Sequence, residues 1–195
     1  MNQKGQIMKR IAVFCGSSLG ANPIYKEKAY ELGREMAKRN IGLVYGGGNK
    51  GLMGIIAHAV YENGGEVIGV LPKAMNVSQV VDNAVHTRLI IVEDMHERKS
   101  TMYSLSEGFV AMPGGIGTLE ELFEIYTWRQ LAIHNHNIAL YNINGFWDLL
   151  EMQLKKTKDE GFLSQEVLDT LIVEEDPKTL LDKLEMETKD LPNKL

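Results

Sequence analysis

The 195-residue sequence contains a single cysteine, Cys15. One cysteine cannot form an intrachain disulfide, and a cysteine-rich zinc site is excluded for the same reason. Because secreted domains commonly depend on disulfides, this scarcity is typical of a reducing compartment, and we expect a cytoplasmic protein. The 5 histidines share no ligand spacing with carboxylates or with Cys15. The sequence therefore predicts no metal site.

Long apolar runs and an excess of basic residues are also missing. No run approaches the roughly 18 apolar residues that cross a bilayer. The first residues, MNQKGQIMKRIAVFCG, lead into the pattern of a folded domain and not to a signal-peptide cleavage site. Lys and Arg number 21 against 26 Asp and Glu, which gives a net charge of -5. We therefore expect neither nucleic acid nor an anionic membrane as a partner.

Short apolar runs alternate with longer amphipathic ones along most of the chain. This alternation predicts an α/β fold with one open parallel sheet of about 6 or 7 strands, helices on both faces and right-handed crossovers. We expect one domain over residues 9–186, a flexible segment at 1–8, an irregular connection at 73–87 and a tail at 187–195. The expected strands are 10–16, 41–48, 66–72, 87–94, 108–113, 137–142 and 170–176, and the expected helices are 23–39, 51–63, 95–105, 118–134, 146–160 and one from about 177.

Three glycine-containing turns follow expected strands: CGSS at 15–18, YGGGNKGLMG at 45–54 and PGGIGT at 113–118. Ligands of open parallel sheets bind beyond the carboxyl ends of the strands, where these turns lie. A single glycine turn is commonly structural, but three that each lead into a helix indicate a phosphate-binding site. Neither the Walker pattern nor Gly-x-Gly-x-x-Gly is present, because Lys50 is followed by Gly51 and the glycine spacing differs. We therefore predict a mononucleotide or sugar phosphate as ligand.

The stretch FVAMPGGIGTLEE, residues 109–121, is typical of a buried strand, a tight turn and a helix that begins at Thr118 as N-cap. Thr118 to Glu121 also fits a capping box, in which Glu121 only bonds back to the Thr118 backbone. Arg98 and Lys99 taken alone also fit a solvent-exposed face of a helix that has no catalytic role. Met95 and Met102 suit a core or a pocket wall, and Tyr126 and Trp128 suit the core or a subunit interface.

If the ligand is a mononucleotide, cleavage of the bond between its base and C1' of its ribose would require particular side chains. It develops positive charge on the sugar and negative charge on the departing base, so a catalyst needs a carboxylate near the sugar and a donor near the base. Glu121 and Arg98 provide these groups, since a guanidinium stays charged at all relevant pH. The sheet-edge position adds further candidates for phosphate contact, namely Cys15, Gly16, Ser17, Ser18, Gly46, Gly47, Gly48 and Gly114.

Four segments together resemble the LONELY GUY family of cytokinin riboside 5'-monophosphate phosphoribohydrolases: GGGNKGLMG at 46–54, MHERK at 95–99, PGGIGTLEE at 113–121 and TWRQL at 127–131. The resemblance extends from about Lys9 to Glu175. It implies a Rossmann-like homodimer that hydrolyses the N-glycosidic bond of a nucleoside 5'-monophosphate, with no metal and no organic cofactor. Such proteins often carry a lysine decarboxylase label, but no lysine motif here indicates a pyridoxal phosphate Schiff base.

The same resemblance assigns roles to individual residues. It gives catalysis to Arg98 and Glu121, and substrate contact to Lys99, Gly115, Ile116, Gly117, Thr118, Leu119, Glu120 and Thr127. The helices at 94–106 and 118–134 carry apolar and aromatic residues that suit a dimer interface.

A function of another class remains open, a non-catalytic carrier of a nucleotide or of molybdenum cofactor on a related fold. A carrier needs the glycine turns but not the pair of Arg98 and Glu121. The presence of both residues favours the enzyme.

Overall fold

The computed structural model describes residues 9–76, 85–188 and 191. The expected flexible segment at 1–8 therefore lies outside the described residues. So does most of the connection at 73–87, and so do all residues of the expected tail except 187, 188 and 191.

A single sheet of 7 parallel strands forms the centre of the molecule, in the order β4-β3-β2-β1-β5-β6-β7. This confirms the predicted parallel α/β fold. Because the chain moves outward to one side of β1 through β2 and then to the other side through β5, the crevice between β1 and β5 is the topological switch point. The strands are β1 (Arg10–Phe14), β2 (Gly42–Tyr45), β3 (Val67–Pro72), β4 (Arg88–Val92), β5 (Gly108–Ala111), β6 (Asn137–Tyr141) and β7 (Leu171–Glu174).

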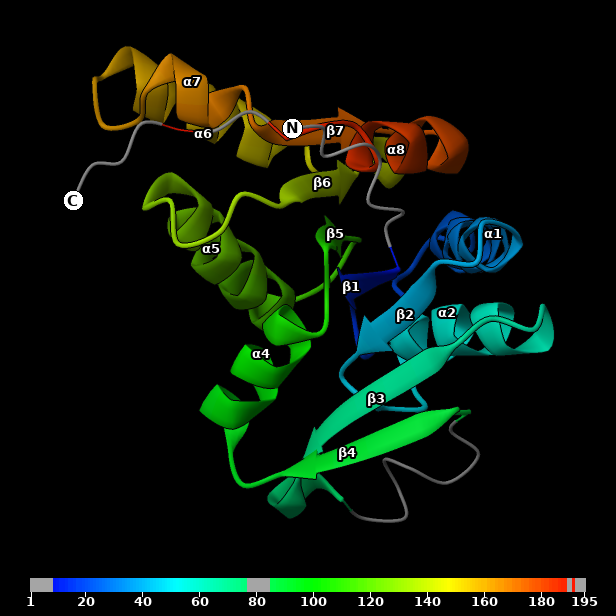
Figure 1. Ribbon diagram of the computed structural model, residues 1–195. Coiled ribbons are helices and arrows are strands. Elements are labelled where there is room, and N and C mark those ends of the chain that lie inside the picture. The colour runs from blue at the N-terminus through cyan, green and yellow to red at the C-terminus, as the bar shows by residue number, and fades with distance from the viewer. Residues whose placement is uncertain (1–8, 77–84, 189–190, 192–195) are drawn as a thin grey trace, which may run out of the picture.

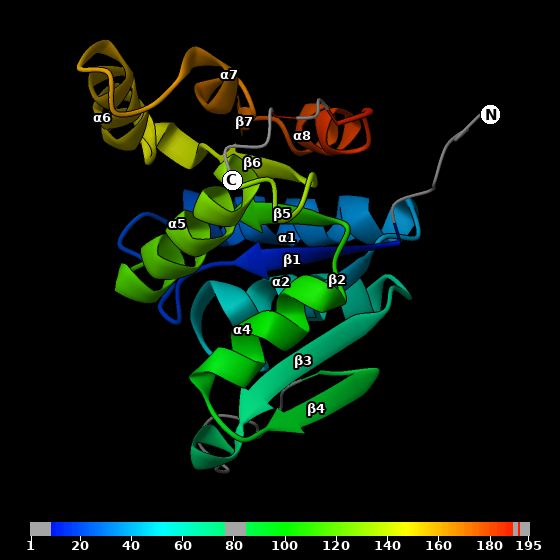
Figure 2. The ribbon, with the colours of Figure 1, turned by 60° about the vertical axis from the view of Figure 1, so that its left-hand side comes forward.

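Helices cover both faces of this sheet (Figures 1 and 2). One face is packed by α1 (Ile24–Lys38), α2 (Gly51–Glu62) and α8 (Pro177–Leu184). The other face is packed by α4 (Met95–Ser104), α5 (Ile116–Gln130), α6 (Asp148–Asp159) and α7 (Gln165–Leu168). Two 3-10 turns, η1 (Lys73–Met75) and η2 (Ile143–Gly145), complete the described elements. Neither α7 nor these turns was predicted, because segments this short show no helical period.

Alternation along β1 shows how the sheet joins the two layers. Ile11 and Val13 contribute to the cluster under α1 and α2, whereas Ala12 and Phe14 contribute to the cluster under α4 and α5. All four side chains are at most 1% exposed. A strand buried on both faces must be apolar at every position, which explains the continuous run IAVF.

The start and end of α5 differ from the prediction. Gly115 is the N-cap, with extended backbone and no side-chain capping bond. Thr118 lies inside the first turn and is buried, so its assignment as N-cap was wrong, and the capping box with Glu121 is wrong with it. The helix ends at Gln130 because the chain reverses at Ala132, whose φ is 54°.

In the described ranges, no helix is both long and apolar enough to cross a membrane.

His134 lies in the segment between α5 and β6, with both ring nitrogens engaged. Nε2 lies 2.9 Å from the Ile125 carbonyl oxygen, and Nδ1 accepts the backbone N–H of His136 at 3.1 Å. These contacts assign the neutral Nε2–H tautomer, since Nδ1 must remain an acceptor. The pKa of His134 is lowered to about 4, mainly by burial. The nearby His136 and Arg129 contribute to the lowering, and the bond to the Ile125 carbonyl opposes it.

The free energy of unfolding is expected to decrease as pH falls from about 6.5 to about 4. The folded state keeps His134 neutral, so its contribution is complete above the unfolded pKa and disappears as the unfolded chain takes up the proton. The expected effect is about 1 to 2 kcal/mol, because solvent screens part of the shift of a half-buried ring. His134→Gln retains an N–H donor but does not titrate, so urea unfolding between pH 7 and pH 4 should show a flatter dependence. His58→Gln is the control, because the His58 side chain is only half-buried. An equal pH dependence of the unfolding free energy in wild type and His134→Gln would contradict the assignment.

Candidate functional site

The three glycine turns meet at the carboxyl edge of the sheet. The backbone N–H of Gly16, after β1, donates to the Pro113 carbonyl after β5 at 3.1 Å. The Leu52 N–H, at the start of α2, donates to the Gly16 carbonyl at 3.0 Å. The predicted convergence of the turns is therefore confirmed, and it occurs at the switch point between β1 and β5.

Glycine is required at two of these positions because backbones touch there. A Cβ atom on Gly51, whose φ is 60°, would lie 2.2 Å from the carbonyl carbon of Ser17. A Cβ atom on Gly114 would lie 2.2 Å from Oγ1 of Thr118 and 2.9 Å from the Gly16 nitrogen. These glycines thus pack the turns together, which is the structural role that a single turn suggests.

Gly115 and Gly117 behave differently from these packed glycines. Added Cβ atoms there would meet nothing within 4 Å, and the intervening Ile116 is 81% exposed. The N-terminus of α5 is therefore uncovered, and the N–H groups of a first helical turn have no intrahelical acceptors. This terminus can receive an anion such as a phosphate.

The two residues assigned to catalysis form a buried ion pair. Nη1 of Arg98, on α4, lies 3.2 Å from Oε1 of Glu121, on α5. Their side chains are only 12% and 10% exposed. Burial raises the pKa of Glu121, and the Arg98 charge opposes this rise. Glu121 lies one helical turn from the uncovered α5 terminus, so a buried carboxylate and a guanidinium accompany the anion site.

Cys15 lies close to this pair but has no polar role of its own. The residue is 7% exposed, and burial, together with the Glu121 charge, raises the pKa of its thiol. Because the nucleophilic form of cysteine is the thiolate, Cys15 is an unreactive packing residue in this state.

Lys99 makes contacts that the sequence did not predict. Its ammonium binds Glu120 and lies 3.0 Å from Oε1 of Glu124, and the Tyr103 hydroxyl donates to Oε2 of Glu124 at 2.7 Å. Burial lowers the pKa of Lys99, but the bonds to both carboxylates raise it overall. A Schiff-base lysine needs a neutral amine, so this environment does not suit Lys99 to that chemistry. The Glu120 and Glu124 spacing of one helical turn was the available signal for this network.

The other predicted site residues lie at different distances from the α5 terminus. Met95 is 44% exposed, and its sulfur lies 4.0 Å from Nη1 of Arg98, where it forms part of the wall beside the ion pair. The Thr127 hydroxyl donates to the Phe123 carbonyl at 2.7 Å. At a rise of about 1.5 Å per residue, Thr127 lies about 15 Å along α5 from Gly117. Within one chain the structure therefore does not bring Thr127 to the anion site. Ser17 and Ser18 are exposed at this edge, Leu119 is half-buried, and Gly16, Gly46, Gly47 and Gly48 are buried.

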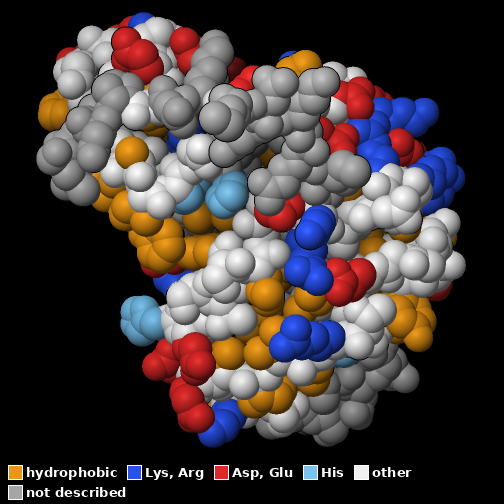
Figure 3. Space-filling view, viewed as in Figure 1, with side chains coloured by type: hydrophobic (Ala, Val, Ile, Leu, Met, Phe, Trp, Pro, Cys, Tyr) orange, Lys and Arg blue, Asp and Glu red, His pale blue; other side chains and the backbone are white. Residues whose placement is uncertain are grey.

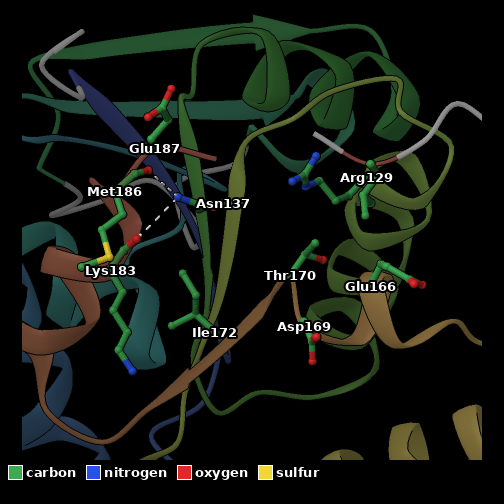
Figure 4. Close-up of a pocket in the computed structure, with 10 residues that line it drawn as sticks. Arg129, Asn137, Glu166, Asp169, Thr170, Ile172, Lys183, Met186 and Glu187 are labelled. Atoms are coloured by element: carbon green, nitrogen blue, oxygen red, sulfur yellow. Dashed lines mark hydrogen bonds between the residues drawn. The ribbon is translucent and has the colours of Figure 1, made fainter. Parts of the chain in front are cut away.

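A separate pocket of about 370 Å³ lies at the opposite edge of the sheet, where β6 and β7 begin (Figure 4). Asn137 donates there to the carbonyls of Leu184 and Met186, both at 3.0 Å, and so binds the C-terminal end of α8. Arg129 extends toward the same pocket from α5 (Figure 4). Because parallel sheets bind ligands at the carboxyl edge, this pocket is not the candidate phosphate site.

Within residues 9–76, 85–188 and 191, no three His, Cys, Asp or Glu side chains are grouped so that they could hold a metal ion.

The parallel sheet, the switch-point turns and the uncovered helix terminus define a Rossmann-like α/β protein with a candidate anion site. A family described as "Possible lysine decarboxylase" matches residues 53–184. Cytokinin riboside 5'-monophosphate phosphoribohydrolase LOG1 of Arabidopsis thaliana is 46% identical over 177 residues, which cover 91% of this chain and 83% of LOG1. Probable cytokinin riboside 5'-monophosphate phosphoribohydrolase LOGL6 of Oryza sativa subsp. japonica is 45% identical over 177 residues, which cover 91% of this chain and 70% of LOGL6. The chain belongs to this LONELY GUY family.

Two solved structures share the fold. The molybdenum cofactor binding protein of Rippkaea orientalis aligns with a TM-score of 0.69 and 21% identity, over 92% of this chain and 97% of that one. The molybdenum cofactor carrier protein of Chlamydomonas reinhardtii aligns with a TM-score of 0.67 and 22% identity, over 91% and 98%. At this identity the alignments support the architecture alone.

Proposed function

We propose that this protein hydrolyses the N-glycosidic bond of adenosine 5'-monophosphate, with or without an N6 substituent, and releases the free base and ribose 5-phosphate. The observation that carries the proposal is the buried Arg98–Glu121 pair, one helical turn from an uncovered helix N-terminus. The names of the curated relatives, cytokinin riboside 5'-monophosphate phosphoribohydrolases, support the same activity.

The proposed mechanism begins with the phosphate at the N-terminus of α5, against Gly115, Ile116, Gly117 and Thr118 and the facing turns of Gly16 and Gly47. This position places the ribose beside Glu121. The carboxylate then stabilises the positive charge that develops on the sugar, or activates the attacking water. Arg98 keeps Glu121 ionised and acts as a donor toward the departing base. Leu119, Glu120, Lys99 and Thr127 are the further substrate contacts in this proposal.

The carrier function is the second candidate. A carrier would use the glycine turns without requiring a buried Arg98–Glu121 pair, and burial of an ion pair often costs more free energy than the pairing returns. The pair therefore favours the enzyme over the carrier.

Turnover is expected to require the 5'-phosphate. Purified protein incubated with AMP or N6-isopentenyladenosine monophosphate should release free base, measured by chromatography, while adenosine should release on the order of 100-fold less or none. The physical reason is that phosphate binding at α5 holds the ribose beside Glu121. Equal turnover of adenosine and AMP would contradict the phosphate site. Tight AMP binding with no base released from either monophosphate would favour the carrier.

We also infer a homodimer formed through α4 and α5. Hydrophobic side chains gather over α5 on the face shown in Figure 3, and Met95, Phe123 and Ile133 are 44%, 41% and 58% exposed. Beside them a groove of about 430 Å³ runs between the two helices, lined by Asp94, His96, Glu97, Lys99, Ser100, Glu124 and Trp128. A second chain on this surface would also supply a partner for the exposed Thr127.

Sedimentation at micromolar concentration is expected to give twice the chain mass of 21.9 kDa. Phe123→Lys should shift the protein toward the monomer, because it places a charge in an apolar interface. Leu149→Lys is the matched control on α6, at a side chain that is 79% exposed. A wild-type protein that sediments as a stable monomer would contradict the inference.

We infer a cytoplasmic location for this small-molecule enzyme. The support is the single cysteine, which is buried and cannot form an intrachain disulfide.

A further inference from the structure

Gly46 directly follows β2 and lies against the guanidinium of Arg98. A Cβ atom added to Gly46 would lie 2.0 Å from Nη2, 3.1 Å from Cζ and 3.5 Å from Nε of Arg98. These are the three nearest atoms, so a side chain at this position would first meet the arginine. Gly46 is not among the glycines with positive φ, and its backbone conformation therefore does not require glycine.

The position of the guanidinium decides its contact with Glu121. Nη1 reaches Oε1 of Glu121 at 3.2 Å from a side chain that is 12% exposed. A methyl group at Gly46 would displace Nη2, and with it the whole planar group, because the guanidinium is rigid. The far end of a flexible side chain moves at low cost, in contrast to backbone atoms. The fold should therefore survive, but the arginine should leave its place against Glu121.

We propose that Gly46 is a positioning residue for the Arg98–Glu121 pair, and that it acts through the room it leaves rather than through contact with the phosphate. This inference rests on the proposed hydrolysis of nucleoside monophosphates. It assigns to the first glycine of GGGNKG a role in catalysis through Arg98, distinct from the packing role of Gly51 in the same segment.

Gly46→Ala is expected to lower kcat on the order of 100-fold while the KM for AMP changes less than about fivefold, since the phosphate site is untouched. Gly42→Ala is the matched control at the first residue of β2. Its added Cβ would lie 2.8 Å from Oε2 of Glu66, also the end of a flexible charged side chain, but at the opposite edge of the sheet. Gly42→Ala should keep kcat within about twofold of wild type. The two variants should melt within a few degrees of each other.

Combination with Arg98→Ala separates the two roles of Gly46. If Gly46 acts through Arg98, the double variant Gly46→Ala/Arg98→Ala should be no slower than Arg98→Ala alone, within about twofold. A further loss as large as the one in wild type would overturn the proposal and assign Gly46 to the phosphate. Wild-type kcat in Gly46→Ala would overturn it as well.

An NMR measurement tests the placement independently of activity. Nε of Arg98 is a buried nitrogen, so its N–H resonance should be protected from exchange and identifiable by its loss in Arg98→Lys. This resonance should shift or lose protection in Gly46→Ala and remain unchanged in Gly42→Ala. An unchanged resonance in Gly46→Ala would overturn the proposal. If the wild-type protein releases no base, the proposed function fails, and this measurement still decides whether Gly46 positions Arg98.

Discussion

Glu121→Gln is expected to reduce base release on the order of 100-fold or more while AMP still binds. Glutamine keeps the size of the side chain, and its carbonyl oxygen can still accept a bond from Arg98, which lies 3.2 Å from Glu121 in the wild type. The substitution removes the negative charge that would stabilise a cationic ribose or activate water. The loss should therefore appear in kcat and kcat/KM more than in the affinity for AMP.

The control for this prediction is a second arginine–glutamate pair. Arg10 and Glu66 lie 2.7 Å apart at the amino edge of the sheet. Glu66→Gln removes the negative charge from a more exposed pair away from the anion site, and it should leave turnover within about twofold of wild type. Base release, AMP affinity and melting temperature are measured for both variants. Near-wild-type turnover in Glu121→Gln would show that the Glu121 carboxylate takes no part in catalysis and that the buried pair is only structural.

Gly51→Ala is expected to lower the free energy of unfolding by about 3 to 5 kcal/mol. Two costs add at this residue. Its φ is 60°, in the left-handed region that disfavours side chains, and the new Cβ would lie 2.2 Å from the carbonyl carbon of Ser17. Because that neighbour is backbone in a turn held by hydrogen bonds, it cannot move away as the end of a side chain could.

Gly64→Ala isolates the conformational cost. Gly64 has a φ of 79°, but an added Cβ would meet nothing within 4 Å. Its substitution should therefore cost only about 1 to 2 kcal/mol. Urea unfolding of both variants measures the difference, which reports the contact between the first two glycine turns. Equal destabilisation would mean that the Ser17 turn relaxes around the new methyl group.

Much of the fold follows from the sequence because its signals are local. A strand buried on both faces, such as IAVF in β1, must be continuously apolar, and a long amphipathic helix such as α1 shows its period over several turns. Helix boundaries were less predictable. Thr118 has the chemistry of an N-cap, but Gly115 takes that position because Thr118 packs against Gly114, and Gly114 in turn lies against Gly16. That contact joins residues about a hundred positions apart in the chain.

For the candidate site, too, some features follow from the sequence and others only from the tertiary structure. The sequence by itself determined which chemical groups are available: three glycine turns at one sheet edge, a helix N-terminus, and the candidates Arg98 and Glu121. Residue type and strand order suffice for this, since all parallel strands end at the same edge. Only the tertiary structure decided which groups meet. Lys99 pairs with Glu120 and Glu124, and the Arg98 guanidinium occupies the space beside Gly46. Such contacts depend on side-chain packing between α4, α5 and the end of β2, which no local pattern in the sequence encodes.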